Sequence, residues 1–398
     1  MNEHVVVVDL GYGDAGKGTV VDWLCATRPV QAVIRFNGGA QAAHNVVLPD
    51  GRHHTFSQFG SGTLRGVPTF LSRHVLVDPL ALSAEAEHLA SIGVRDPFAM
   101  ITADPGALVA TPYHVEAGRR RELGRGEGRH GSCGMGIGET MRHATAHPDT
   151  ALRVSDCLST SVLTRKLRLL RDDLGVEGPP CAAVVAAYRA FGRRVRISGD
   201  VPLKGMVVFE GAQGVLLDET YGFPPFNTWS TTTFANALEL SPSAARLGVL
   251  RTYTTRHGPG PLVTEDPTLE VPEPHNADGP WQGPFRRGHF DAVAHRYALE
   301  VCGGADALAL THLDAPVNRM CTSYDTFQRL PAQADPPAQF ALTAALLKAR
   351  PVYGPAVTHW PSAVGEALGV PVALGSYGPT SADKVVVAGA ALGGRPLL

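Results

Sequence analysis

The sequence predicts an α/β fold, a single large domain around a mainly parallel β-sheet. Two observations indicate this. Short apolar runs alternate with helical segments along the chain, and such alternation favours parallel strand pairing. The first apolar run, four consecutive valines at residues 5–8, leads into a glycine-rich turn and then into a helix. A short run that is apolar throughout is typical of a strand buried on both faces.

The remaining elements follow from the same pattern. Residues 20–24 predict the first helix, directly after the glycine-rich turn. Further strands are predicted at residues 32–36, 206–209, 247–253 and 307–310. Helices are predicted between several of these strands, at residues 80–92, 161–173 and 291–301.

Two segments are rich in glycine, proline and polar residues, at positions 118–138 and 267–288. Both are too long for ordinary connections, so we expect loop insertions that are either disordered or functional. No linker interrupts the pattern between them. The sequence therefore predicts one domain over residues 1–398, with two long loops inserted into it.

The composition excludes several classes of protein. Apolar residues make up 44% and charged residues 18% of the 398 residues, and the formal net charge is −2, so no basic field points to nucleic acid. The six cysteines form no CxxC pair, which argues against a disulfide framework or a zinc site. No signal peptide or membrane span is recognisable, so we expect a cytoplasmic protein with no membrane or nucleic-acid partner.

Residues 11–18 (GYGDAGKG) have the GxxxxGK spacing of a phosphate-binding P-loop, between the first strand and the first helix. Glycines there let backbone N–H groups point at phosphate oxygens, and the helix N-terminus favours anions. Lys17 adds a point charge, and lysine is informative here because only five of the 35 basic residues are lysines. The loop is a variant form, since Gly18 replaces the usual Ser or Thr and Asp14 lies inside it.

This variant loop closely resembles the GDEGKG signature of the adenylosuccinate synthetase family. More matches follow in the order of that family, spread over nearly the whole chain. They lie at residues 35–44 (RFNGGAQAAH), 131–138 (GSCGMGIG), 209–218 (FEGAQGVLLD), 225–233 (PFNTWSTTT), 253–261 (YTTRHGPGP), 286–291 (RRGHFD), 311–314 (THLD) and 378–379 (GP). A P-loop alone is weakly specific, whereas an ordered series of matches is strongly so.

The resemblance implies a ligase that joins L-aspartate to the 6-oxo carbon of a purine nucleotide, with IMP as the expected acceptor. It also implies hydrolysis of GTP or ATP through a 6-phosphoryl intermediate, a requirement for Mg²⁺ and a homodimer. By the same resemblance, Asp14 removes the N1 proton of the purine, His44 hydrogen-bonds the phosphoryl group and Gln213 contacts the base. Asp14 and the backbone carbonyl of Ala43 are expected to hold Mg²⁺.

The resemblance also implies three sets of binding residues. The triphosphate is expected at Gly13, Gly16, Lys17, Gly18, Asn45, His312, Asp314, Gly378 and Pro379, where Asp314 reads the guanine. The acceptor nucleotide is expected at Gln41, Ser132, Cys133, Gln213, Leu217, Thr228 and Arg142. Arg286 and Arg287 are expected at the aspartate carboxylates. The arginine that reaches the partner subunit's nucleotide is either Arg142 or Arg153.

Four features depart from the family pattern. His312 stands in place of a lysine, Gln41 in place of an asparagine and Cys133 in place of a threonine. In the aspartate loop, Gly283 and Phe285 fall where the family has arginines. These changes leave open the choice between GTP and ATP, between ribose and deoxyribose, and among the arginines that hold aspartate.

Two alternatives therefore stay open. One is the same chemistry on dGMP, another deoxynucleotide or an unusual purine nucleotide of a specialised pathway. Retention of Asp14 favours an IMP-like base. The other is a nucleotide-binding switch or an inactive paralogue, although a protein that only binds nucleotide needs none of Asp14, His44 and Gln213.

Three polar features have simpler interpretations. For Asp218 and Asp291, both a functional role and the bracing of loops stay open. The arginines at residues 119–121 are predicted to form a solvated helix face.

Overall fold

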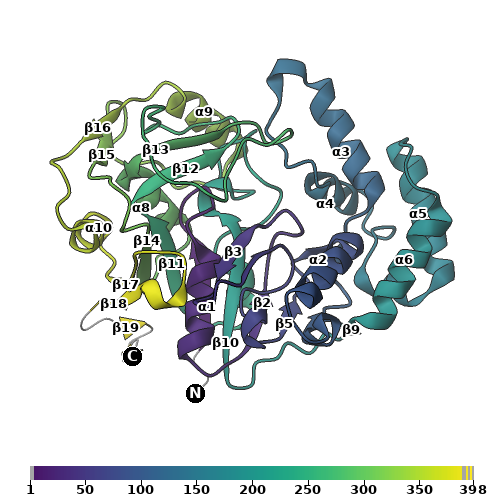
Figure 1. The fold of residues 1–398 in the computed structure, drawn as a ribbon. Helices are drawn as coiled ribbons and strands as arrows, with labels where there is room; N and C mark the ends of the chain where they lie inside the picture. Colours follow the sequence, from purple (N-terminus) through teal and green to yellow (C-terminus); the bar gives the residue numbers. More distant parts are fainter. Residues whose placement is uncertain (1–3, 388–390, 393–394, 397–398) are drawn as a thin grey trace.

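A ten-stranded sheet runs through the computed structural model, which describes residues 4–387, 391–392 and 395–396 (Figure 1). In the described part of the chain its neighbouring strands are parallel, except for the antiparallel pair at one edge. The strands in spatial order are β18 (Lys384–Val386), β17 (Val372–Ser376), β14 (Ala307–Thr311), β11 (Ala245–Arg251), β1 (Val5–Asp9), β10 (Met206–Gly214), β2 (Val30–Arg35), β5 (Thr69–Leu71), β7 (Ile101–Ala103) and β9 (Arg196–Ile197). The predicted α/β fold with a mainly parallel sheet is confirmed.

The position of β1 in this sheet locates the site. β1 lies between β10 and β11, and its four valines alternate between two buried clusters, Val6 and Val8 in one and Val5 and Val7 in the other. From β1 the chain first builds the sheet outward to β9, then returns to β10 and continues on the other side. Ligands of open α/β sheets bind outside the carboxyl ends of the strands at such a reversal.

A second, four-stranded sheet joins β12 (Tyr253–His257), β13 (Phe285–Asp291), β15 (Met320–Tyr324) and β16 (Pro351–Tyr353). The strand predicted over 247–253 is present up to Arg251 as part of β11, but it ends two residues early because the chain changes sheets there. β11 ends its pairing with β14 at Arg251, and Thr252 then donates its N–H to Thr311 O before β12 pairs with β13. Three two-stranded pairs complete the strands: β3 (His44–Val47) with β4 (His53–Phe56), β6 (Leu76–Val77) with β8 (Leu108–Val109), and β19 (Ala391–Leu392) with β20 (Arg395–Pro396).

The predicted helices at 80–92, 161–173 and 291–301 are present as α2, α5 and α8, and the one at 20–24 belongs to α1. The α-helices of the described residues are α1 (Lys17–Thr27), α2 (Pro79–Ser91), α3 (Pro112–Gly124), α4 (Ile137–Ala146), α5 (Thr160–Leu174), α6 (Cys181–Arg194), α7 (Ala235–Leu240), α8 (Ala292–Val301), α9 (Pro336–Leu346) and α10 (Trp360–Leu368). Short 3₁₀ helices are η1 (Thr63–Arg65), η2 (Pro97–Met100), η3 (Gly126–Gly128), η4 (Val154–Leu158), η5 (Val215–Leu217) and η6 (Ser381–Asp383). None of the described helices is both long and apolar enough to cross a membrane.

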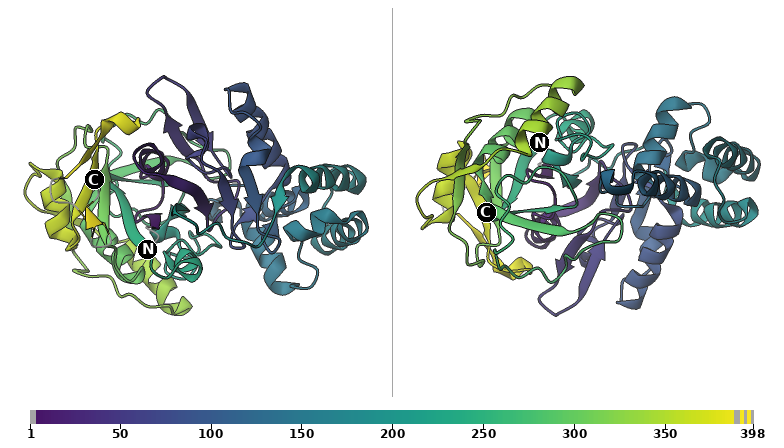
Figure 2. Two further views of the ribbon diagram at one scale, coloured as in Figure 1. Left: turned by 90° about the horizontal axis from the view of Figure 1, so that it is seen from below. Right: turned by 90° about the horizontal axis from the view of Figure 1, so that it is seen from above.

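Helices α3 to α6 gather beyond the β9 edge of the sheet, at the opposite end of the molecule from β17 and β18 (Figure 1, Figure 2). This group changes the interpretation of the first long loop. Residues 118–124 are the second half of α3, because Thr111 caps the helix, Pro112 starts it and good helix formers follow the glycine at 118. The irregular stretch is therefore shorter than predicted, from Arg125 to Gly136 with a 3₁₀ turn inside it.

Two acidic residues prove to brace local structure. Asp291 is the N-cap of α8 and accepts hydrogen bonds from the N–H groups of Val293 and Ala294 at 3.1 and 3.0 Å. Asp218 accepts from three backbone N–H groups in the loop that follows β10, including that of Thr232 at 2.7 Å. Such carboxylates fix loops beside the site rather than enter it.

Candidate active site

A cavity of about 970 Å³ lies where the P-loop, the β12–β13 loop and the α3–α4 loop meet. It brings together every residue predicted for catalysis, for the metal, for the triphosphate and for the acceptor nucleotide. They are Asp14, His44, Gln213, Ala43, Gly13, Gly16, Lys17, Gly18, Asn45, His312, Asp314, Gly378, Pro379, Gln41, Ser132, Cys133, Leu217, Thr228 and Arg142. Arg286 and Arg287 do not line this cavity.

The P-loop is folded around a carboxylate of its own strand. Asp9, the last residue of β1, accepts hydrogen bonds from the N–H groups of Gly11 and Ala15 at 2.8 Å and of Gly13 at 3.3 Å. Lys17 Nζ lies 3.2 Å from Asp9 Oδ2 and donates to the backbone carbonyl of Gln213 at 2.7 Å. Asp9 therefore braces the backbone of the loop and holds Lys17 beside it.

Asp14 lies inside this loop with a left-handed backbone, φ 60°. Its Oδ2 is 3.3 Å from Nε2 of His257, a residue of β12 that the sequence analysis did not single out. Burial alone would raise the pKa of Asp14, but His257, Lys17 and Arg251 outweigh it and hold the pKa below its ordinary value. Burial likewise opposes the charge on His257, yet Asp14 raises the pKa of that imidazole. The result is an ionised carboxylate at the cavity wall, oriented by the imidazole of His257.

His44 is oriented by a second buried pair. Its Nδ1 lies 2.6 Å from Oε1 of Glu210, which also accepts from the N–H of Ser61 at 2.9 Å and from the Ser61 hydroxyl. Burial and Arg35 lower the pKa of His44 to about 4 although Glu210 opposes them, so the ring is neutral with Nδ1–H donating to Glu210. Burial would raise the pKa of Glu210, but His44, Arg35 and Ser61 lower it to about 2. Glu210 thus fixes which imidazole nitrogen faces the cavity.

Two glutamines in the cavity wall have unmet hydrogen-bonding capacity. Gln213, also left-handed with φ 61°, donates from Nε2 to Thr228 Oγ1 at 2.9 Å, while its Oε1 finds no partner among the described residues. Both side-chain polar atoms of Gln41 are buried and lack such a partner as well. Buried polar groups are nearly always hydrogen-bonded in proteins, so these atoms mark places where a polar ligand can bind.

The α3–α4 loop supplies a basic wall that sequence reasoning missed. Arg121 and Arg125 line the cavity, and Arg121 is also 47% exposed, so the predicted solvated face at this residue borders the site. Glu139 pairs with Arg121 at 2.5 Å and with Arg142 at 2.6 Å, and Glu122 pairs with Arg125. The sequence holds one signal of this arrangement, since Glu122 and Glu139 each stand three positions before an arginine, a spacing that pairs side chains on a helix. It does not show in which direction those residues face.

The same wall carries residues 131–133. The N–H groups of Gly131 and Ser132 are held by Glu122 Oε1 at 2.8 and 3.3 Å. Burial raises the pKa of the Cys133 thiol, so it stays protonated and is a poor nucleophile. These contacts fix the loop that the family resemblance places over the acceptor nucleotide.

His312 and Asp314 line the opposite end of the cavity, after β14. His312 is left-handed with φ 57°, its Nδ1 lies 2.8 Å from Thr311 Oγ1, and its ring meets Tyr253 edge-on at 5.5 Å between centroids. Burial lowers the pKa of His312 well below its ordinary value, so the side chain is a neutral, flat surface. Such a surface can pack along a base without adding the charge of a lysine.

The β12–β13 loop places other residues in the cavity than the two predicted arginines. Arg286 is bound to Glu265, with Nε at 2.9 Å from Oε1, and to the carbonyls of Gly258 and Gly260 at 3.0 and 2.8 Å. The cavity is instead lined by residues 272–277 and Gln282. Glu273 docks this segment, because its buried carboxylate pairs with Arg251 and accepts from the Tyr253 hydroxyl at 2.7 Å.

The profile of the adenylosuccinate synthetase family matches residues 6–380. An adenylosuccinate synthetase from Anaeromyxobacter sp. (strain K) is 35% identical over 350 residues, covering 81% of this chain and 78% of that protein. One from Marinomonas sp. (strain MWYL1) is 31% identical over 445 residues, covering 97% and 99%.

Two solved structures share the fold. Fully ligated adenylosuccinate synthetase from Plasmodium falciparum superposes with a TM-score of 0.82 at 19% identity, over 97% of this chain and 100% of that one. Succinoaminodeoxyadenylate synthetase from cyanophage S-2L, bound to dGMP and to dATP as energy donor, gives a TM-score of 0.64 at 17% identity, over 97% and 95%. The chain belongs to the adenylosuccinate synthetase family, and it is a C–N bond-forming ligase that joins aspartate to a purine nucleotide.

Proposed function

We propose that the acceptor is IMP, that GTP or ATP supplies the phosphoryl group, and that Asp14, His44 and Gln213 carry the chemistry. The observation that supports this proposal is that two side chains with fixed orientations, Asp14 and His44, share one cavity with the P-loop. Asp14 is held as a carboxylate by His257, and His44 is held by Glu210. A protein that only binds nucleotide has no need for either pair.

In the first step, the Asp14 carboxylate takes the N1 proton of the 6-oxopurine. The electrons shift to O6, which attacks the γ-phosphorus as the bond to the β-phosphate oxygen breaks. The amide of Gln213 holds the base, and the unpartnered Oε1 of this residue supports such a contact. Negative charge gathers beside His44, which raises the pKa of the imidazole, so the ring donates a hydrogen bond to the phosphoryl oxygens.

In the second step, the amine of aspartate attacks C6 and the 6-phosphate leaves, after which the nitrogen loses a proton. The products are the succino-nucleotide, inorganic phosphate and the nucleoside diphosphate. Phosphorylation is needed because an amide-like oxygen is otherwise a poor leaving group. Exclusion of water from the cavity protects the phosphorylated intermediate from hydrolysis.

Mg²⁺ fits the donors that this cavity offers. Hard oxygen ligands suit it, and the Asp14 carboxylate and the Ala43 carbonyl are two such donors beside the P-loop. We propose that these two residues hold the ion together with phosphate oxygens. When bound, Mg²⁺ neutralises phosphate charge during transfer.

For Arg286 and Arg287 to bind the aspartate carboxylates, their side chains have to turn from β13, on which they lie, toward the cavity. Arg286 would exchange Glu265 and two backbone carbonyls for the substrate. A homodimer is part of the proposal, with Arg142 reaching the partner's acceptor nucleotide. Its side chain is half-exposed and paired with Glu139, whereas Arg153 lies away from the cavity and donates to Gly106 O.

A second candidate acceptor is dGMP or another deoxynucleotide. It is favoured by the loop in which Gly283 and Phe285 stand at family arginine positions, since Gln282 rather than an arginine of this stretch lines the cavity. A site that lacks a group contacting the ribose 2′-hydroxyl would accept a deoxyribonucleotide.

A substrate panel tests the proposal. Purified protein with aspartate and Mg²⁺ is given IMP, dIMP, GMP or dGMP, each with GTP or ATP, and products are identified by mass. A succino-adduct on IMP supports the first candidate, and an adduct confined to dGMP or a deoxynucleotide supports the second. Triphosphate hydrolysis without consumption of aspartate on any acceptor would contradict both and favour a switch.

A further inference from the structure

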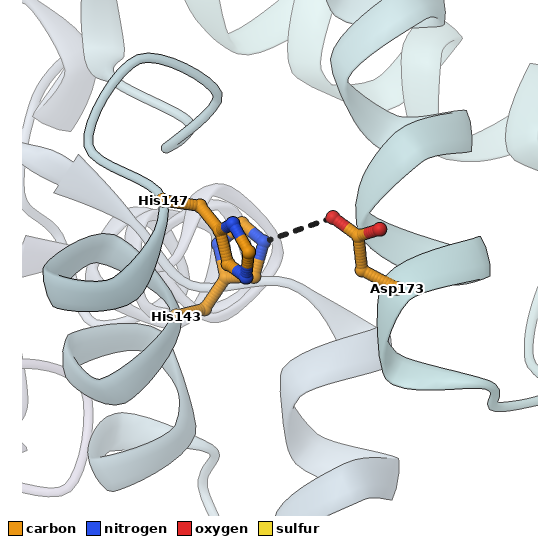
Figure 3. Close-up of side chains that lie close together, drawn as sticks. All are labelled: His143, His147 and Asp173. Carbon is orange, nitrogen blue, oxygen red and sulfur yellow. Dashed lines mark ion pairs between the residues drawn. The ribbon is translucent and has the colours of Figure 1, made fainter.

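A second group of ligand-type side chains lies outside the active-site cavity, among the helices beyond β9. It consists of His143 on α4, His147 directly after that helix, and Asp173 on α5 (Figure 3). One ligand atom from each of the three lies within 4.8 Å of the others. The two imidazoles lie side by side and the carboxylate faces them from the neighbouring helix (Figure 3).

The buried member of the group has an unmet polar atom. The His143 side chain is 4% exposed, and its Nε2 is buried without a hydrogen-bond partner among the described residues. Asp173 Oδ2 is 3.7 Å away, which is too long for a hydrogen bond. Buried ring nitrogens without a hydrogen-bond partner are rare in proteins. An atom bound between this imidazole and the carboxylate would account for the arrangement.

The spacing and chemistry of the group select one class of ion. His147 is the C-cap of α4, and its N–H donates to the carbonyl of His143 at 2.8 Å, which places the two imidazoles 5.1 Å apart between ring centroids. Two imidazoles and a carboxylate are donors that suit zinc and related first-row divalent ions, whereas Mg²⁺ prefers oxygen donors alone. We propose that His143, His147 and Asp173 bind a zinc-type divalent ion, with water as the fourth ligand.

The geometry requires a small closure. Ligand atoms of a tetrahedral zinc ion lie roughly 3.3–3.4 Å apart, given bonds of about 2.0–2.1 Å. His147 and Asp173 are exposed, so their side chains can rotate inward without disturbing packing. The fixed partner is the buried His143, which sets the position of the ion.

Charges around the group permit a cation. Arg142, next to His143 in sequence, is engaged by Glu139 at 2.9 and 2.6 Å. A cation near the last turn of α4 also interacts favourably with the helix dipole. The ion would fasten the end of α4 to α5, while the first turn of α4 lines the active-site cavity through Ile137, Gly138 and Glu139.

Zinc binding to the tag-free full-length chain tests the proposal. Zn²⁺ is titrated by calorimetry, bound metal is counted after dialysis, and Co²⁺ is used as a spectroscopic probe of the coordination geometry. We expect one bound ion, a Co²⁺ spectrum typical of four-coordinate sites, and a rise in the thermal midpoint with Zn²⁺. Asp173→Asn and His147→Gln should each weaken Zn²⁺ binding at least tenfold, and both change exposed side chains, so folding is preserved.

Matched controls separate this site from the rest of the chain. Asp172→Asn and Asp149→Asn remove neighbouring exposed carboxylates and should leave Zn²⁺ affinity unchanged. Asp14→Asn, in the active-site cavity, should also leave it unchanged. The proposal is overturned if wild type binds no Zn²⁺ at micromolar concentration, if Asp173→Asn binds as tightly as wild type, or if Asp14→Asn alone abolishes binding.

Discussion

Three cavity residues share an uncommon backbone conformation. Asp14, Gln213 and His312 have φ of 60°, 61° and 57°, and each lines the active-site cavity. Among the described residues, the one other non-glycine residue with positive φ is Asp96, which lies elsewhere. Left-handed backbone costs about 1–3 kcal/mol for such residues and persists where the surroundings enforce it. The concentration of this strain at one cavity supports a functional role for these three side chains.

Asp14→Asn is expected to abolish catalysis while leaving triphosphate binding within a few-fold of wild type. The substitution keeps the size of the side chain but removes the base, so phosphate release that depends on the acceptor nucleotide should fall by about 10²–10⁴-fold. Phosphate release and nucleotide titration measure the two effects. Asp50→Asn, at an exposed position, is the control. Near-normal turnover of Asp14→Asn would show that another group is the base.

Glu210→Gln is expected to slow catalysis by about 10–100-fold, less than loss of His44 itself. The carboxylate acts through His44, since it holds Nδ1 and raises the pKa of the ring. In the proposed mechanism, the negative charge of the bound substrates raises the pKa of His44 so that Nε2 carries a proton. Loss of Glu210 lowers that pKa, so the alkaline limb of the kcat–pH profile should move to lower pH. Ser61→Ala, which removes one hydroxyl bond to Glu210, should shift the limb less. An unmoved limb in Glu210→Gln would indicate a merely structural role.

At the scale of elements, the β12–β13 loop is docked by one buried ion pair. Glu273 is 5% exposed and Arg251 is 4% exposed, and Arg251 also donates from Nη1 to the backbone carbonyl of Asp14 at 3.1 Å. Arg251 therefore holds both the β12–β13 loop and the backbone of Asp14, the proposed general base. Removal of one partner leaves a buried charge uncompensated, which is strongly unfavourable.

Glu273→Gln is expected to release residues 267–284 and to raise the KM for aspartate several-fold. Released loops are cut more readily by proteases, so limited proteolysis should show new cleavage within this segment. Glu270→Gln changes an exposed carboxylate of the same loop and should behave as wild type. Equal proteolysis of the two variants would mean that Glu273 does not hold the loop.

For the whole molecule, buried histidines should make the fold acid-labile. Burial lowers the pKa of His44 and His295 to about 4 and of His114 to about 3, so the unfolded chain binds three protons below pH 6.5 that the folded chain refuses. Asp291 opposes them, because burial raises its pKa to about 6 and the folded chain binds that proton. Burial also lowers the pKa of His312 well below its ordinary value, so protons bound by the unfolded chain at these histidines outnumber the one at Asp291, and the free energy of unfolding should fall as the pH decreases from 6 to 4.

Thermal unfolding between pH 7.5 and pH 4.5 measures this slope. The contribution of Glu210, whose pKa is about 2, has the same sign but enters only below about pH 4.5. A flat profile across pH 6 to 4.5 would contradict the neutral state of these buried histidines. The same melts test a further proposal, that residues 1–398 form one cooperative domain, because one sheet joins strands from residue 5 to residue 386. Two separated transitions would contradict it.

Local sequence determined much of this protein. The valine run, the glycine-rich turn and the residue pattern along the chain were enough to predict the central strand, the P-loop and helices α1, α2, α5 and α8. Ordered motifs were enough to recognise the family and to name the residues that meet in the cavity. Both kinds of signal lie within short stretches, where backbone preference and residue spacing act directly.

Tertiary structure alone decided the pairings that give those residues their chemistry. Asp14 meets His257, and His44 meets Glu210, 166 positions away. Arg121 turns into the cavity while Arg286 is held outside it by Glu265. His143, His147 and Asp173 meet only because α4 packs near α5. Spacing along the chain fixes which face of an element a side chain occupies, but the partner of that face depends on how distant elements pack, which no local pattern encodes.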